Sequence, residues 1–128
     1  MAVSKRRVLP DTRKSLTHKV YIESGQGRIS LFITVGLYKN GDPGEVWINV
    51  GKQGSTLRGL TDTVAIGLSL MLQHHVPLET IVGQYKNHSY LPQGPTSNTD
   101  IPNCSSIIDY VVRFLEFHFL KEEIDGTT

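Results

Sequence analysis

A short segment rich in glycine, basic residues and hydroxyl groups is the first place where the sequence could do chemistry. Residues 51–58 read Gly-Lys-Gln-Gly-Ser-Thr-Leu-Arg and follow a predicted strand. A helix predicted to begin near Ser55 or Thr56 would present free amide groups, and its dipole would favour an anion. Lys52 and Arg58 would add positive charge, which favours a phosphate at this position. The spacing differs from a Walker P-loop, and an ordinary capped helix start explains the same residues.

A long loop, predicted over residues 87–103, supplies a second set of candidates. It contains three prolines and several small polar residues, and a loop of this length in a small domain is usually functional or disordered. Planar side chains beside amides and hydroxyls suit a purine, because stacking supplies energy and polar edges supply specificity. The candidates are Tyr85, Tyr90, Thr96, Asn98 and Asp100. The alternative is a tyrosine that merely anchors a proline-rich loop.

Two arginines form a third candidate group. Arg113 follows Asp109 by four residues, so an exposed i, i+4 ion pair explains it without any function. However, the helix predicted over residues 105–120 is apolar almost all round, which suggests a subunit interface. Repeated there by symmetry, Arg113 and the nearby Arg28 would form a ring of forked phosphate donors.

The sequence contains no convincing catalytic or metal-binding pattern. His74 and His75 are adjacent, so on a helix they point about 100° apart and cannot chelate one ion as an i, i+4 pair would. Cys104 is the only cysteine, which excludes an internal disulfide and favours a buried thiol. We therefore expect no catalytic residues, no metal and no cofactor, and a protein that is not an enzyme.

Alternating hydrophobicity predicts the elements that would position these residues. Residues 28–38 alternate cleanly, and strands are predicted over 17–22, 28–38 and 45–50, with Trp47 pointing away from the core. Helices are predicted from Ser55 or Thr56, over 78–86 and over 105–120. The buried stripe predicted for the first helix comprises Leu57, Leu60, Val64, Leu68, Met71 and Leu72. The prediction is a single α+β domain over residues 1–128, with an N-terminal antiparallel sheet of about three strands followed by two or three helices.

The charge is unevenly distributed along the chain. The net charge is +1, but residues 1–19 carry +5 and residues 20–128 carry −4. We interpret residues 1–13 as a basic and flexible arm, and the acidic body argues against polymeric nucleic acid as a partner. The sequence shows neither a secretory signal nor a membrane span, so we expect a soluble cytosolic protein.

Several short motifs occur in an order that resembles a known domain. They are Leu9-Pro10-Asp11-Thr12-Arg13, Gly44-Glu45-Val46-Trp47-Ile48, Arg58-Gly59-Leu60, Val76-Pro77-Leu78-Glu79, Pro92-Gln93-Gly94-Pro95 and Ser105-Ser106-Ile107-Ile108-Asp109-Tyr110. The series resembles the TSCPD-type accessory domain near the C-terminus of adenosylcobalamin-dependent ribonucleotide reductases, over about residues 7–120. The reductase chemistry does not carry over, because it requires a redox cysteine pair and a large barrel.

A free-standing copy of this domain is similar to the first family of phage Thoeris anti-defence proteins. Those proteins are sponges, which bind cyclic nucleotide immune signals without cleaving them. The resemblance implies that glycocyclic ADP-ribose binds between subunits, and that hexamers, as trimers of dimers, hold the cyclic trinucleotides of CBASS at an arginine-rich site. The implied residues for the smaller signal are Tyr90, Tyr85, Asn98, Thr96, Asp100, Arg58 and Lys52. Arg28 and Arg113 would bind the phosphates of the trinucleotide. The resemblance also implies that the protein acts in the cytoplasm of the infected bacterial host.

Three hypotheses on function follow from these observations. The leading one is a phage sponge that sequesters a cyclic nucleotide, with no polymeric nucleic acid and no membrane among its partners. The alternative is a nucleotide-binding accessory subunit of a ribonucleotide-reductase-like system. The third, a phosphodiesterase-like enzyme, is disfavoured because the sequence shows no metal cluster or general-base pair.

Overall fold

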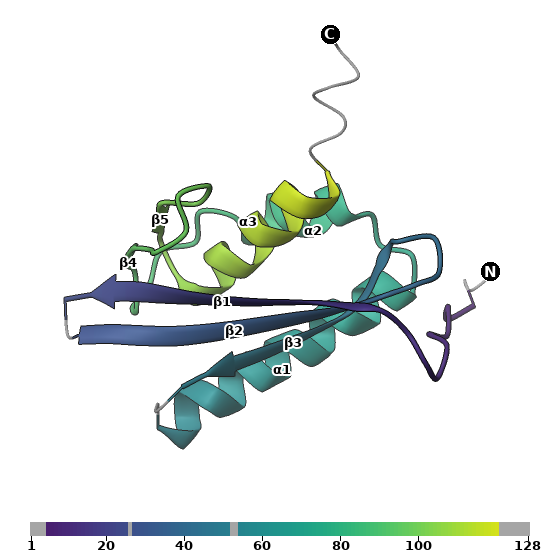
Figure 1. Cartoon of the computed structure of the whole chain (residues 1–128), viewed down its shortest axis with the longest axis horizontal. Helices are drawn as coiled ribbons and strands as arrows, with labels where there is room; N and C mark the ends of the chain where they lie inside the picture. Colours follow the sequence, from purple (N-terminus) through teal and green to yellow (C-terminus); the bar gives the residue numbers. More distant parts are fainter. Residues whose placement is uncertain (1–4, 26, 52–53, 121–128) are drawn as a thin grey trace, which may run out of the picture. The chain divides into compact units, whose positions relative to one another are not determined.

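The computed structural model describes residues 5–25, 27–51 and 54–120. In chain order the elements are β1 (Ser15–Ser24), β2 (Gly27–Leu37), β3 (Pro43–Val50), α1 (Ser55–Gln73), α2 (Leu78–Tyr85), β4 (Gly94–Pro95), β5 (Asn103–Cys104) and α3 (Ile107–Phe119) (Figure 1). The first three strands form an antiparallel sheet in the order β1-β2-β3, which confirms the predicted α+β class. The short antiparallel pair β4–β5 involves residues 94–95 and 103–104, where a loop was predicted over residues 87–103.

The chain divides into two compact units. The first comprises residues 1–19 and 32–77, and the second comprises residues 20–31 and 78–128. Strands β1 and β2 contribute residues to both units. Each unit therefore has its own helices and its own buried side chains.

In the first unit, helix α1 runs along the edge strand β3 (Figure 1). Val46, Ile48 and Val50 of β3 are buried as their alternation predicted, and Trp47 between them is exposed. The Ser69 hydroxyl accepts a hydrogen bond from the Val46 N–H group at 2.8 Å and also lies 3.2 Å from the Val46 carbonyl oxygen. A helix hydroxyl thus occupies the Val46 N–H group, with which a further strand would otherwise pair.

Helix α1 corrects two predictions. Its N-cap is Gly54, without a side-chain hydrogen bond, rather than Ser55 or Thr56. The predicted stripe was also wrong in part, because Leu60 is 61% exposed while Thr61 and Ala65 are buried beside Leu68. The physical reason is the close approach to β3: small side chains at the contact let the Ser69 hydroxyl reach the strand backbone.

The basic N-terminal residues that the structure describes make specific contacts within the first unit. Arg13 donates to both carboxylate oxygens of Glu45, at 2.5 and 3.1 Å. Arg7 pairs with Asp42 at 3.1 Å, and its guanidinium lies 3.7 Å from the centre of the Tyr38 ring. Much of the positive charge of this segment is therefore used in contacts with the same unit.

The second unit contains α2, α3, the β4–β5 pair and the turn end of the β1–β2 hairpin. Helix α3 packs against α2 and β5. Its buried residues are Ile107, Ile108, Asp109, Tyr110, Val111, Val112, Phe114 and Leu115. We interpreted the all-round apolar character of this helix as a subunit interface, but packing within a single chain already buries these side chains.

One glycine fixes the path of the loop in the second unit. Gly94 has a φ of +146°, and a Cβ atom there would lie 2.3 Å from the Glu23 carbonyl oxygen. Beyond this point the loop pairs with β1: the Tyr21 N–H group donates to the Ser97 hydroxyl at 2.9 Å, and the Ser97 N–H group donates to the Tyr21 carbonyl at 2.9 Å. Only glycine fits where the loop meets the hairpin so closely.

Candidate functional site

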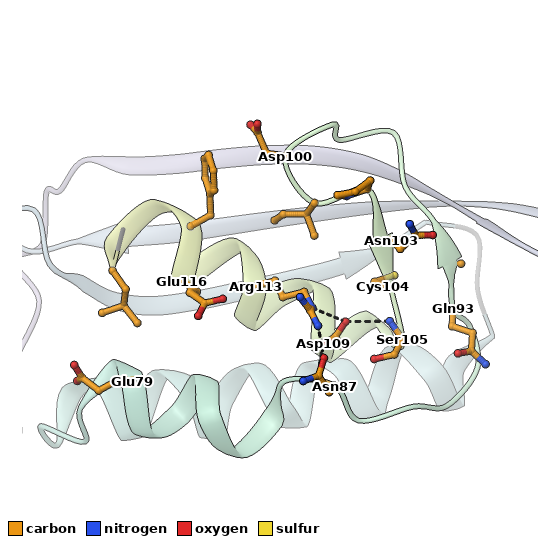
Figure 2. A pocket seen from close by; sticks show the side chains of 15 residues that line it. Glu79, Asn87, Gln93, Asp100, Asn103, Cys104, Ser105, Asp109, Arg113 and Glu116 are labelled. Carbon is orange, nitrogen blue, oxygen red and sulfur yellow. Dashed lines mark hydrogen bonds and ion pairs between the residues drawn. The ribbon is translucent and has the colours of Figure 1, made fainter. Parts of the chain in front are cut away.

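A pocket in the second unit, with a volume of about 1170 Å³, is the main candidate site. Its walls come from the loop over residues 93–105, from α3, from the start of α2 and from the turn that follows α2 (Figure 2). The lining residues that carry the argument below are Asn87, Gln93, Asn103, Asp109, Arg113 and Phe117. A volume of this size is sufficient for a nucleotide-sized ligand.

Asp109 is the structural centre of this pocket. Its side chain is fully buried, and its carboxylate accepts the backbone N–H groups of Asn87 at 2.6 Å and Ser105 at 3.0 Å. The Nε group of Arg113 donates to both carboxylate oxygens, at 2.9 and 3.0 Å (Figure 2). Burial raises the pKa of a carboxyl, but these donors more than offset it, so the pKa of Asp109 is lowered from its ordinary value.

Arg113 is oriented by these contacts and still has donors available. One of its terminal nitrogens, Nη2, donates to the Asn87 side-chain oxygen, whereas the other, Nη1, has no hydrogen-bond partner among the described residues. The side chain retains 30% of its exposure and lines the pocket. A guanidinium fixed on one side and open on the other is suited to bind a phosphate or a carbonyl oxygen.

The remaining charges around the pocket are mostly negative. Glu116 is paired with Lys86 at 2.9 Å, and the carboxylate residues Glu79 and Asp100 are exposed at the rim. These carboxylates would accept hydrogen bonds from the hydroxyl or amino groups of a ligand. They would repel a chain of phosphates, so the pocket favours a ligand with limited negative charge near Arg113.

The inner surface of the pocket combines apolar side chains with amides. Ile101 and Cys104 are buried, and Phe117 is half-buried. Gln93 and Asn103 offer both donors and acceptors to the ring edges of a ligand. Burial raises the pKa of the Cys104 thiol, so the thiol stays protonated at neutral pH and is a poor nucleophile.

Comparison with known families decides what kind of domain carries this pocket. Residues 4–119 match the TSCPD domain, which covers most of the chain. The chain belongs to the TSCPD family. It is 43% identical over 117 residues, 91% of this chain, to the vitamin B12-dependent ribonucleotide reductase of Rhodopirellula baltica, of which it covers 11%. It is 36% identical over 118 residues, 92% of this chain, to the enzyme of the same description from Streptomyces avermitilis, of which it covers 12%.

This TSCPD chain thus spans only about a tenth of the length of the curated relatives that it matches. A third such relative, from Bradyrhizobium diazoefficiens, is 33% identical over 122 residues, 94% of this chain and 9% of the relative. No solved structure matches the chain. The comparisons therefore show the domain family.

The pocket of the TSCPD domain brings together only part of the predicted site. Arg113 and Asp100 both line it. The Arg113–Asp109 ion pair was predicted as an exposed surface pair, but its carboxylate is completely buried. The burial reflects the turn after α2 and the start of α3, which both direct backbone N–H groups at Asp109.

Thr96 and Asn98, predicted to contact a base, brace the loop instead of lining the pocket. The Asn98 side chain accepts from the Asp100 N–H group at 3.0 Å and donates to the Tyr110 hydroxyl at 2.9 Å. The Thr96 hydroxyl accepts from the Asn98 N–H group at 3.1 Å and donates to the Ile101 carbonyl at 2.5 Å. Both side chains therefore set the shape of the loop that forms one wall.

The two predicted stacking residues lie outside the pocket lining. Tyr90 is 47% exposed, and its backbone N–H group donates to the Ser105 carbonyl at 3.0 Å. Tyr85 is half-buried, with its ring centre 6.4 Å from that of His88. Neither ring is among the side chains that line the pocket of this chain.

The other predicted cations are distributed over both units. Arg58 lines a separate cavity in the first unit, and Lys52 lies outside the described residues. Arg28 is in the second unit, where it pairs with Glu23 at 2.6 Å and lies over the Tyr21 ring. Arg113 and Arg58 line different cavities, and Arg28 lines neither of these two.

The sequence analysis missed most of the polar lining, namely Glu79, Asn87, Gln93, Asn103, Ser105, Asp109 and Glu116. One signal was available: Ser106 stands three residues before Asp109, and the Ser106 hydroxyl accepts the Asp109 N–H group at 3.0 Å as the N-cap of α3. Across the described part of the chain, no group of three or more His, Cys, Asp or Glu side chains could hold a metal ion. No described helix is long and apolar enough to cross a membrane.

Proposed function

We propose that this TSCPD chain is a nucleotide-binding module that does not itself catalyse a reaction, and that it serves a ribonucleotide-reductase-like system as an accessory part. The observation that carries the proposal is Arg113, held by the buried Asp109 with one face open to a pocket of about 1170 Å³. The relatives described as vitamin B12-dependent ribonucleotide reductases support the reductase context, because such enzymes act on nucleotides.

In this proposal each part of the pocket recognises one part of a nucleotide. Arg113 binds a phosphate, and the amides of Gln93 and Asn103 hydrogen-bond to the base. The base packs against Phe117 and Ile101. The carboxylates at the rim accept hydrogen bonds from the ribose hydroxyl groups. The protonated Cys104 thiol supplies no nucleophile, so binding leaves the ligand intact.

The test is a residue-resolved binding experiment with ribonucleotides and deoxyribonucleotides of all four bases. Two-dimensional NMR should show amide shifts confined to the loop over residues 93–105 and to the first turns of α3. Arg113→Lys keeps a positive charge beside Asp109 but removes the fork, so it should weaken binding about tenfold. Arg7→Lys, a change to an arginine that is also ion-paired but lies in the first unit, should bind as the parent does.

The reductase context is tested separately, by adding the protein to a vitamin B12-dependent ribonucleotide reductase from which the TSCPD region has been removed. The parent should restore the nucleotide dependence of turnover, and Arg113→Lys should not. If nucleotides caused no amide shifts in the loop, the binding proposal would be contradicted. If nucleotides bound but the protein had no effect on the reductase, only the proposed role in a reductase system would be contradicted.

The size of the pocket favours a second candidate function. A volume of about 1170 Å³ exceeds what a single nucleotide fills, and it is large enough for a compact two-ribose ligand such as glycocyclic ADP-ribose. In this role the protein is a phage anti-defence sponge that sequesters the Thoeris signal in the cytoplasm of an infected bacterium. Incubation with the signal, heat denaturation and recovery of intact ligand would support sequestration, and recovery of a cleaved product would exclude it.

The sponge role also requires assembly into homo-oligomers, which we propose to be hexamers built as trimers of dimers. The exposed apolar side chains Leu60, Ile66 and Leu70 on α1 provide a surface for such assembly. Three copies each of Arg28 and Arg113 would then match the three phosphates of a cyclic trinucleotide of the CBASS type. Light scattering should give a mass of several times 14.3 kDa, and Leu70→Glu should lower it.

A further inference from the structure

The first unit contains a second cavity, of about 740 Å³, that the proposed function does not use. It lies where β3 meets the first turns of α1, beside the exposed face of the sheet. The residues that define it are Thr17, Phe32, Thr34, Trp47, Arg58 and Asp62. All of them belong to the first unit, so the cavity is described within one compact body.

Trp47 presents an uncovered aromatic surface to this cavity. The side chain is 59% exposed, and it has no ring, cation or hydrogen-bond partner among the described residues. Phe32, in the same cavity, already has the Lys19 ammonium group 5.3 Å from its ring centre. Leaving an indole uncovered in water is unfavourable, because a tryptophan surface is normally buried against another group.

Arg58 presents an uncompensated positive charge to the same cavity. Its guanidinium has no ion-pair or hydrogen-bond partner in the described ranges, although Asp62 lies one helical turn further along α1. This contrasts with arginines 7, 13, 28 and 113, each of which is paired with a carboxylate. A free guanidinium on the first turn of a helix is suited to an anion.

Uncommitted hydroxyl and amide groups complete the lining. The side chains of Thr17, Thr34 and Asn49 line the cavity and have no hydrogen-bond partner within the part of the chain that is described. These side chains can form hydrogen bonds with the polar edges of a planar ring. The single carboxylate of Asp62 would repel further negative charge, so the cavity suits one phosphate group better than a polyphosphate.

We infer that this cavity is a second ligand site, which takes an aromatic ring carrying a single phosphate, the chemistry of a nucleoside monophosphate. The ring stacks on Trp47, Arg58 binds the phosphate, and the hydroxyl groups of the sheet face contact the ring edges. The inference is independent of the pocket around Arg113, because the two sites share no residue. A protein contact would also use an exposed tryptophan, but the polar side chains around Trp47 favour the small anionic ligand.

The experiment uses the intrinsic fluorescence of Trp47, the only tryptophan in the sequence. The full-length protein is titrated with AMP, adenosine, ATP and inorganic phosphate, with excitation at the red edge of indole absorption, where adenine does not absorb. AMP should quench the emission, because stacking places the base on the indole. Adenosine should bind about tenfold more weakly than AMP, and ATP should bind no more tightly than AMP.

Two substitutions assign the signal to this cavity. Arg58→Gln should reduce the affinity for AMP about tenfold, to that of adenosine, and should leave the response to adenosine unchanged. The matched change Arg113→Gln, in the second unit, should leave the quenching by AMP unchanged while it weakens binding in the other pocket. Both arginine side chains are at least partly exposed, and circular dichroism would show that each variant is folded.

Three results would overturn the inference. They are emission that does not respond to AMP, an affinity for AMP that is unchanged in Arg58→Gln, and emission that varies with protein concentration but not with AMP. The last result would assign the surface to a protein contact. Quenching by AMP with no binding in the Arg113 pocket would support this site and contradict the proposed function, so the two failures are distinguishable.

Discussion

The two arginines Arg58 and Arg113 show how differently the two units prepare a cation for a ligand. Arg113 is held by a fully buried carboxylate and a side-chain amide, and only part of its guanidinium is open. Arg58 is exposed on the first turn of a helix, with no protein partner in the described ranges. An arginine that is already positioned loses little entropy on binding, whereas a free one must be ordered by its ligand. The Arg113 site in the second unit is therefore preorganised for a ligand, and the Arg58 site in the first unit is adaptable.

The largest effect is expected from removing the buried carboxylate. Asp109→Ala leaves two backbone N–H groups without acceptors and leaves Arg113 without its partner, so the free energy of unfolding should fall by about 3 kcal/mol or more. Urea denaturation of the variant and the parent measures this difference in the free energy of unfolding. The exposed carboxylate of Asp62 in the first unit is the control, and Asp62→Ala should change stability by less than about 0.5 kcal/mol.

The next effect concerns the loop that forms one wall of the Arg113 pocket. Gly94→Ala places a methyl group 2.3 Å from a carbonyl oxygen at a φ of +146°, and it should cost about 2 kcal/mol. Gly83→Ala in α2, where nothing lies within 4 Å, should instead stabilise the protein by up to about 1 kcal/mol. If both substitutions had the same effect in urea denaturation, the loop would not be held as rigidly as its contacts indicate.

A smaller effect is expected from pH, and it tests the electrostatic part of the comparison. The folded state lowers the pKa of Asp109, so the carboxylate contributes stability above the pKa of the unfolded chain, about 4. That contribution is lost as the pH falls through the lower pKa of the folded state. Urea denaturation of the parent and of Asp109→Asn should therefore differ most near neutral pH and converge in acid. A constant difference from neutral pH into strong acid would contradict this account.

The smallest effect is expected in the first unit. Trp47→Ala and Arg58→Ala remove side chains that are largely exposed, so each should change the free energy of unfolding by less than about 0.5 kcal/mol. Thermal denaturation of the two variants, compared with that of the parent, measures these changes in the free energy of unfolding. A loss of more than about 1 kcal/mol in Arg58→Ala would show that this arginine serves the fold.

The sequence predicted the parts of the fold that depend on local periodicity. The alternation over residues 28–38 placed Ile29, Leu31, Ile33 and Val35 correctly in the core, because a strand that is buried on one face repeats every two residues. Helix α1 was placed correctly along the chain, but its buried face was predicted only in part. That face depends on how closely the helix approaches β3, and periodicity does not encode this distance.

The candidate site was predictable only where its contacts are local. The Arg113–Asp109 pair follows from an i, i+4 spacing, but the contact between Asp109 and Asn87 spans 22 positions. Thr96 and Asn98 have the side chains of a binding loop, and the structure uses them to brace that loop. A polar residue in a loop can bind a ligand or its own chain, and only the folded geometry distinguishes the two.

The hydroxyl of Ser69 has a consequence for how this protein can associate. It accepts the N–H group of Val46 on the edge strand β3, while Ser97 bonds both the N–H and the carbonyl group of Tyr21 on β1. Both outer strands of the sheet are thus closed at these positions by hydroxyl groups and loop backbone. A free sheet edge is the template for uncontrolled strand addition and for fibril growth. At Val46 and Tyr21 the two edges are protected against both, because another strand cannot pair with backbone groups that are already bonded.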